Sequence, residues 1–252
     1  ADTVSHDAAR DPALARQGGK GIGRFQRLLV DMPGTLEETL PGFHDMRYRF
    51  RQWDETLAVD PAGRRHLVKE EIAWIEARRD EMLAFRSKIE TGEIPTRVTH
   101  NDTKISNILF DRDGAILCVI DLDTVLSSSC LNDYGDAIRS YANTGLEDDR
   151  DLYRVTLDMK IFEAYTRGYL SEAIAFLVPA EREYLAFSAR YITFEQVLRF
   201  LMDYIGGDTY YKIKYAEHNL VRARAQYKLL RSMEERYGET RAVIERVIRE
   251  QE

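Results

Sequence analysis

The chain has 252 residues, of which 44% are hydrophobic and 31% charged, a composition typical of a globular domain. Its net charge of -7 at pH 7, without a segregated basic patch, argues against nucleic acid as a partner. It has only two cysteines, no apolar run near the ~20 residues of a membrane span, and no signal-peptide core at its start. We therefore expect a cytoplasmic protein without a membrane partner. The sequence does not determine the number of subunits.

The first third of the chain is predicted to be helical. Residues 11–32 form the first helix, since an aspartate can cap its start and a Pro-Gly pair follows its end. Residues 36–57 mix aromatic and charged side chains around a second Pro-Gly pair, which favours short helices or loops. Helical spacing of apolar residues returns over 64–89 and ends before a glycine.

The middle of the chain, residues 97–125, changes to the spacing of short strands. Strands are predicted at 97–100, 108–110 and 115–120. An Asp-Gly pair at 113–114 lies between two apolar runs and indicates a hairpin turn. We call residues 97–125 the hairpin region.

After residue 124 the spacing of apolar residues is helical again. The predicted helices span residues 133–141, 152–170, 181–204, 220–237 and 239–249. The fold class is therefore predicted to be mainly α with a small β-hairpin region, in one unit of residues 1–252. The two cysteines, Cys118 and Cys130, are not spaced as a metal pair, and we expect them to be packing residues.

Polar chemistry is concentrated in the hairpin region. A loop carboxylate at Asp102 can accept a proton from a substrate hydroxyl. Asn107 and Asp121, the latter at the tip of the next strand, offer oxygen ligands of the kind that Mg²⁺ prefers. His100 is expected to tie the loop to neighbouring backbone. A base, a carboxamide and an acidic strand end, here Asp121 and Asp123, are the parts needed to activate a hydroxyl and hold a magnesium-bound triphosphate.

The sequence of this region resembles a known family. HNDTKISNILF, followed by VIDLDTV and DYGDAIRSYAN, resembles the catalytic loop and metal strand of the aminoglycoside phosphotransferase and choline kinase superfamily, which has a protein-kinase-like fold. RFLMDYIGGDTYYK and EHNLVRARAQYKLL are similar to its N-acetylhexosamine 1-kinase branch. The resemblance implies an ATP- and Mg²⁺-dependent kinase that phosphorylates a sugar. It also implies that Asp102 is the catalytic base and that Asn107 and Asp121 are the magnesium ligands.

Five further residues receive roles from the same resemblance. Asp123 would lie near the sugar or the metal. Arg199 and Tyr210 would line the acceptor pocket. Asp136 and Arg139 would brace the catalytic loop, although an acidic residue with an arginine one turn later is also an ordinary structural pair.

The resemblance further implies a nucleotide-binding lobe of strands before such a chain, and no motif of that lobe is found here. The glycines of residues 18–23 do not form a phosphate loop, because no strand precedes them and no Ser or Thr follows the lysine. We expect them to lie on a closely packed helix face. Residues 1–252 are thus expected to be the C-terminal lobe alone, with little or no kinase activity, since nothing else would orient the triphosphate.

Two alternatives come from other functional classes. VIDLDTVL also resembles the first motif of haloacid-dehalogenase-type phosphatases, in which Asp121 would be the nucleophile and Asp123 the acid and base. That fold requires alternating strands and helices downstream, and it leaves the residues around Asp102 unexplained. A non-catalytic lobe that binds a sugar or a partner is the other alternative.

Among kinases, the acceptor is the least determined element. An aminoglycoside would require a strongly acidic pocket, and the acidic run of residues 147–151 is more simply a solvated loop. Choline would require an aromatic cage, for which Tyr204, Tyr210, Tyr211 and Tyr215 are close enough in sequence. Aromatic faces also stack on sugar rings, and the resemblance around Asp121 and Arg199 favours a sugar.

Overall fold

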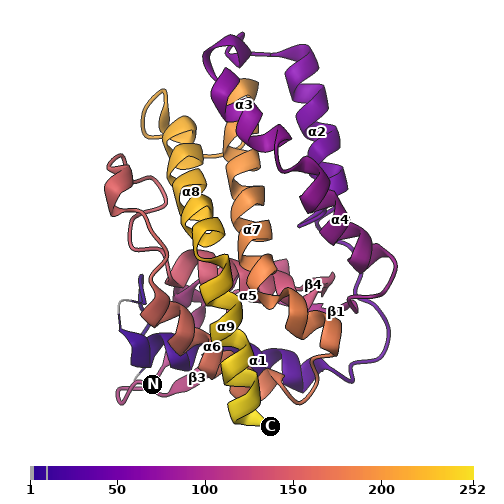
Figure 1. The fold of residues 1–252 in the computed structure, drawn as a ribbon, viewed down its shortest axis with the longest axis vertical. Coiled ribbons are helices and arrows are strands. Elements are labelled where there is room, and N and C mark those ends of the chain that lie inside the picture. Colours follow the sequence, from indigo (N-terminus) through magenta and orange to yellow (C-terminus); the bar gives the residue numbers. More distant parts are fainter. Residues whose placement is uncertain (1–2, 10) are drawn as a thin grey trace.

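The computed structural model describes residues 3–9 and 11–252 and is mainly helical, with two small sheets in its lower half (Figure 1). The helices are α1 (Pro12–Leu29), α2 (Met46–Val59), α3 (Lys69–Glu76), α4 (Arg79–Glu90), α5 (Cys130–Tyr141), α6 (Met159–Ala173), α7 (Pro179–Gly206), α8 (His218–Glu235) and α9 (Tyr237–Gln251). The strands are β1 (Arg97–Thr99), β2 (Ile108–Phe110), β3 (Ile116–Val119) and β4 (Leu126–Ser128). The predicted fold class is confirmed.

The two sheets are antiparallel pairs. β2 pairs with β3 across the predicted hairpin, in which Gly114 has a φ of +80° and the Asp111 carboxylate accepts the N–H groups of Asp113 and Ala115. β1 pairs with β4. The prediction that helical structure returns directly after residue 124 was wrong, because β4 lies between that residue and α5. A strand of three residues is too short to show a periodic pattern in the sequence.

Two other predicted boundaries differ from the structure. The segment 64–89 is divided into α3 and α4. The segment 152–170 begins with a single helical turn and an extended stretch, and α6 starts only where the Asp158 carboxylate accepts the N–H groups of Lys160 and Ile161. Cys130 is buried as expected, whereas Cys118 is exposed on β3. No helix in the described ranges is both long enough and apolar enough to cross a bilayer.

Helix α7 is the long central element of the fold. It packs against α5 in its lower half and against α2 and α8 (Figure 1). The α5 contact is close because a side chain at Gly135 would overlap the carbonyl of Ser188. Large aromatic side chains, including Tyr134, Tyr165 and Tyr169, fill the interior between α5 and α6. The core therefore holds α5 rigidly against two helices.

The glycines of α1 allow it to pack directly on α6. A Cβ atom at Gly19 would overlap the carbonyl oxygen of Tyr165, and one at Gly23 would come within 2.6 Å of the carbonyl oxygen of Tyr169. A Cβ atom at Gly168 of α6 would overlap the carbonyl oxygen of Arg16. The expectation that these glycines lie on a packed helix face is confirmed.

The variant Gly168→Ala should destabilise the protein by at least about 1–3 kcal/mol, because neither backbone can move without displacing a whole helix. Gly238→Ala is the matched control, since a methyl group at this position of α9 would have no other atom within 4 Å; it should be neutral or stabilising by up to about 1 kcal/mol. Urea unfolding of both variants measures the difference, and equal stabilities would contradict this account of the α1–α6 contact.

Candidate active site

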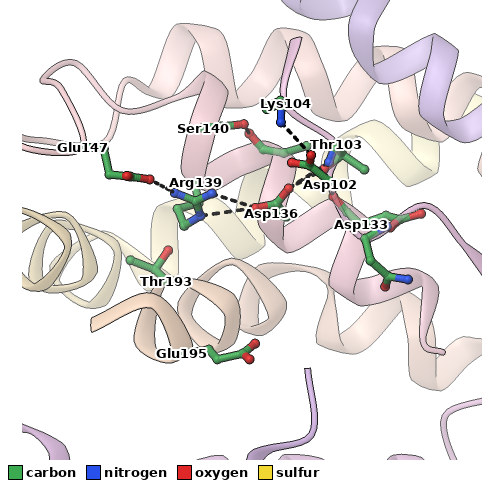
Figure 2. A network of polar contacts seen from close by, with 12 residues as sticks. Asp102, Thr103, Lys104, Asp133, Asp136, Arg139, Ser140, Glu147, Thr193 and Glu195 are labelled. Carbon is green, nitrogen blue, oxygen red and sulfur yellow. Dashed lines mark hydrogen bonds and ion pairs between the residues drawn. The ribbon is translucent and has the colours of Figure 1, made fainter. Parts of the chain in front are cut away.

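The predicted base and one predicted metal ligand meet in the loop between β1 and β2. Asp102 Oδ2 accepts hydrogen bonds from Asn107 Nδ2 at 3.0 Å and from Lys104 Nζ at 2.6 Å; Figure 2 shows the Lys104 contact. Asn107 Nδ2 also donates to the backbone carbonyl of Asp102 at 2.9 Å. A single helical turn, η2 (Ile105–Asn107), brings Asn107 back to Asp102.

Two carboxylates of α5 hold the backbone of this loop. Asp133 accepts the N–H of His100 at 2.9 Å and that of Asn101 at 2.6 Å. Asp136, one turn later on α5, accepts the N–H of Thr103 at 2.8 Å. All of these groups are buried. Three backbone donors that belong to no helix or strand ladder thus have charged acceptors on a rigid helix, which fixes the loop on either side of Asp102.

The electrostatic environments of the two carboxylates differ. Burial raises the pKa of Asp133, although the loop N–H groups stabilise its anion. Burial would also raise the pKa of Asp136, but the guanidinium of Arg139 outweighs it and the pKa lies below its ordinary value. Arg139 bonds Asp136 at 2.9 Å and Glu147 at 3.3 Å (Figure 2). Sequence reasoning missed Asp133, although its i, i+3 spacing with Asp136 just after the hairpin region was a usable signal.

His100 ties the loop to the strand that precedes Asp121. The ring is fully buried; its Nδ1 accepts the N–H of Asp102 at 3.3 Å, so Nε2 carries the proton and donates to the carbonyl of Ile120 at 2.9 Å. The N–H of Ile120 donates to the carbonyl of Asn107 at 2.9 Å. The residue before Asp121 is therefore bonded to both His100 and Asn107.

Asp121 has a left-handed backbone conformation. Its φ of 64° and ψ of 63° lie in the left-handed region, which costs about 1–3 kcal/mol outside glycine and is often retained for function. Its carboxylate is exposed and makes no hydrogen bond to the described residues. Asp123, two residues later in the turn η3 (Leu122–Thr124), is likewise exposed. A conformation held by Ile120 thus presents unpaired carboxylates to solvent.

The donor set suits a magnesium ion only in part. Because the Asn107 amide donates to Asp102, its Oδ1 is left without a partner, and the Asp121 carboxylate is also unpaired. Across residues 3–9 and 11–252, no three His, Cys, Asp or Glu side chains converge as metal ligands. Mg²⁺ commonly takes one or two protein oxygens and completes its shell with water and phosphate oxygens. The pair Asn107 and Asp121 is compatible with that mode.

Arg199 and Tyr210 lie together, but in a separate cavity of about 320 Å³ between α2 and α7, to which Asp102, Asn107, Asp121 and Asp123 do not contribute. The Arg199 guanidinium contacts Tyr210 Oη at 3.4 Å and lies 5.6 Å from the ring centroid of Tyr210. In the described part of the chain it forms no ion pair. This cavity therefore has a partly buried guanidinium without a carboxylate partner.

A buried relay connects that cavity to the loop that carries Asp102. Glu195, one turn before Arg199 on α7, bonds Arg49 Nε at 3.0 Å and His44 Nδ1 at 2.6 Å. His44 Nε2 lies 3.4 Å from the carbonyl oxygen of Asn101. Burial would raise the pKa of Glu195, but His44 and Arg49 outweigh it and the pKa falls well below its ordinary value. Sequence reasoning missed the relay, because its members are 146 and 151 residues apart.

Comparison with known proteins gives a family and a fold. The family model APH, described as a phosphotransferase enzyme family, matches residues 3–185, a range that includes the hairpin region and ends before Arg199 and Tyr210. The structure downstream of β4 is helical from α5 to α9, which is not the strand and helix alternation that the phosphatase alternative requires.

Solved structures of three kinases are similar to this one. An ethanolamine kinase of Plasmodium vivax is 15% identical with a TM-score of 0.51, over 88% of this chain and 62% of that kinase. A choline kinase of Cryptosporidium parvum Iowa II is 12% identical with a TM-score of 0.54, over 98% and 72%. The spectinomycin phosphotransferase APH(9)-Ia, solved with ADP and spectinomycin, is 14% identical with a TM-score of 0.51, over 93% and 69%. The chain thus spans less than two thirds of the ethanolamine kinase, and these likenesses establish the fold.

The variant Glu195→Gln should destabilise the protein at pH 7 by about 3–5 kcal/mol, because it leaves Arg49 and His44 without their buried anion. Since the folded pKa of Glu195 is lowered, its contribution is present above the ordinary value of 4.5 and is lost as the pH falls below it. The variant should therefore lose less stability than the wild type between pH 7 and pH 4.

Urea unfolding at both pH values measures this effect. Glu183→Gln, an exposed carboxylate on the same helix, is the control and should follow the wild type at both. If the free energy of unfolding changes by the same amount between pH 7 and pH 4 in Glu195→Gln and in the wild type, protonation of Glu195 does not contribute to the loss of stability in acid.

Proposed function

The chain belongs to the phosphotransferase enzyme family, and from that premise we propose that it carries the acceptor and metal-binding half of an ATP-dependent small-molecule kinase that phosphorylates a sugar hydroxyl. One observation carries the proposal: Asp102, Asn107 and the backbone before Asp121 are joined by hydrogen bonds into one clamped unit. A base, a carboxamide oxygen and an acidic residue at the end of the next strand are the parts that phosphoryl transfer uses.

In this proposal Asp102 accepts the proton of the attacking hydroxyl. Asn107 and Lys104 each donate to Oδ2, so Oδ1 is the oxygen that is open to a substrate. Lys104 is exposed and can neutralise phosphate charge as it leaves Asp102. Asn107 Oδ1 and the Asp121 carboxylate would hold Mg²⁺, which when bound neutralises charge on the transferred phosphoryl group.

The division into lobes is part of the same proposal. The hairpin region and the helices around it would supply the base, the metal ligands and the acceptor site, and the nucleotide-gripping lobe would lie outside residues 1–252. The ethanolamine kinase, of which this chain spans 62%, is long enough to contain such an additional lobe. Residues 1–252 by themselves would then have little kinase activity, because no nucleotide-binding lobe would orient the triphosphate.

The charges of the cavity around Arg199 favour a sugar over a cationic acceptor. Tyr210 and Tyr211, which could have formed a cage for choline, have the Arg199 guanidinium 5.6 and 5.5 Å from their ring centroids. Asp203 also lines the cavity, but its carboxylate already accepts backbone N–H groups, including those of Thr209 and Tyr211. Glu55 also lines the cavity but is exposed to solvent. The partly buried guanidinium of Arg199, next to the tyrosine rings, repels choline or an aminoglycoside bound there and can donate to a sugar hydroxyl or acyl oxygen.

Replacing the proposed base tests the reaction. In the complete kinase, Asp102→Asn should lower turnover by about 10²–10⁴-fold, because the neutral amide cannot take the proton, while sugar affinity changes by less than about two-fold. Asp113→Asn, in the exposed hairpin turn, is the control and should keep wild-type turnover. An Asp102→Asn enzyme that keeps its turnover would remove Asp102 from the base role.

Replacing Arg199 tests the acceptor class. Arg199→Met should weaken N-acetylhexosamine binding by about ten-fold or more in calorimetry, since a charge-assisted hydrogen bond contributes about 1.5–3 kcal/mol. Arg24→Met, exposed on α1, is the control. The wild type should bind neither choline nor an aminoglycoside more tightly than the sugar. Tighter binding of either cation would reject the sugar assignment while leaving the base intact.

A further inference from the structure

A second cavity, of about 590 Å³, borders the catalytic loop at Lys104. The end of α5 (Ser140 and Tyr141), the loop after it (from Asn143 onward) and Gln226 of α8 form its walls. It shares no lining residue with the Arg199 cavity. Its volume lies within the range of about 300–1,000 Å³ that small-molecule sites occupy.

Most charged groups around this cavity are already neutralised. Lys104 pairs with Asp102, and Arg139 pairs with Asp136 and Glu147 (Figure 2). The Asp158 carboxylate caps α6, and Arg154 lies 3.8 Å from Asp149. Asp7, which also lines the cavity, is exposed to solvent. The buried part of the cavity therefore has little free charge with which to bind an ionic ligand.

The unpaired polar groups in the buried part of the cavity are neutral. Gln226 is 1% exposed, and both its Nε2 and its Oε1 lack a hydrogen-bond partner among the described residues, as does Tyr141 Oη. The other buried glutamine, Gln26, is fully paired: its Nε2 donates to Asp133 at 2.7 Å and its Oε1 accepts from Tyr169 at 2.7 Å. A buried polar group without a partner destabilises the folded protein, so a ligand that pairs with it is favoured.

We propose that this cavity is a binding site for an uncharged, polyhydroxylated ligand, whose hydroxyl groups pair with the amide of Gln226 and the hydroxyl of Tyr141. A hydroxyl is both donor and acceptor, so adjacent hydroxyls of one sugar ring can satisfy both atoms of the amide. Ser140 and Asn143 add neutral polar groups to the walls. Such a ligand is either the acceptor itself, an assignment that rests on the proposed kinase function, or a second sugar bound independently of it.

The test is calorimetric titration of the 252-residue chain with N-acetylglucosamine, glucose and maltose, without nucleotide or magnesium. The wild type should bind at least one of them. Gln226→Met should weaken that binding about ten-fold, since two neutral hydrogen bonds contribute about 0.5–1.5 kcal/mol each. Its melting temperature should equal or exceed that of the wild type, because an unpaired amide has been removed. Gln251→Met, exposed at the end of α9, should bind as the wild type does.

Tyr141→Phe removes only the hydroxyl and provides a second test if Gln226→Met does not fold; it should weaken the same sugar severalfold. No sugar binding by the wild type, or unchanged affinity in the folded variants, overturns the proposal. Because the readout is binding, a lack of kinase turnover does not affect it.

Arg199→Met separates the two sources of the ligand. A single bound sugar per chain that both Arg199→Met and Gln226→Met weaken is the acceptor, shared between the two cavities. If a second sugar binds, or if Gln226→Met alone weakens the binding, the sugar in this cavity is a ligand independent of the acceptor. Either outcome supports the cavity as a carbohydrate site.

Discussion

The candidate site depends on one interaction: the carboxylates of Asp133 and Asp136 accept the backbone N–H groups of the loop that carries Asp102. An irregular buried loop needs acceptors for its donors, and water cannot supply them there. Helix α5 supplies them from consecutive turns, and α5 is itself fixed by the close approach of Gly135 to α7. The position of the loop backbone on either side of Asp102 is thus set by helix packing.

The second constraint joins the loop to the predicted metal strand. His100 accepts from the N–H of Asp102 and donates to the carbonyl of Ile120, so one neutral tautomer connects the two segments. The next residue, Asp121, has a left-handed backbone. Its carboxylate is exposed and unpaired next to this buried clamp, which is consistent with the proposed role as a ligand of a metal ion. The strain and the clamp support a single functional unit.

Local features of the site could be predicted from the sequence, and long-range ones could not. Asp102 and Asn107 are five residues apart, so a turn brings them together. The contact of His44 with Glu195 spans 151 residues and joins a loop to a helix, which no periodicity reveals. The roles of Arg199 and Tyr210 rested on resemblance alone; the structure groups them, but in a cavity apart from Asp102.

The acidic run of residues 147–151 was also more structured than its sequence suggested. The acidic run of residues 147–151, expected to be a solvated loop, is largely engaged in contacts. Glu147 pairs with Arg139, and Asp148 pairs with the buried His218 at 2.9 Å, which lowers the pKa of Asp148. Carboxylates that already bind cations of the same chain cannot recognise a polycation without losing those bonds. An overall charge of -7 therefore coexists with cavities whose buried or partly buried unpaired groups include a guanidinium, an amide and a phenol, and such groups can donate hydrogen bonds to hydroxyl and carbonyl oxygens.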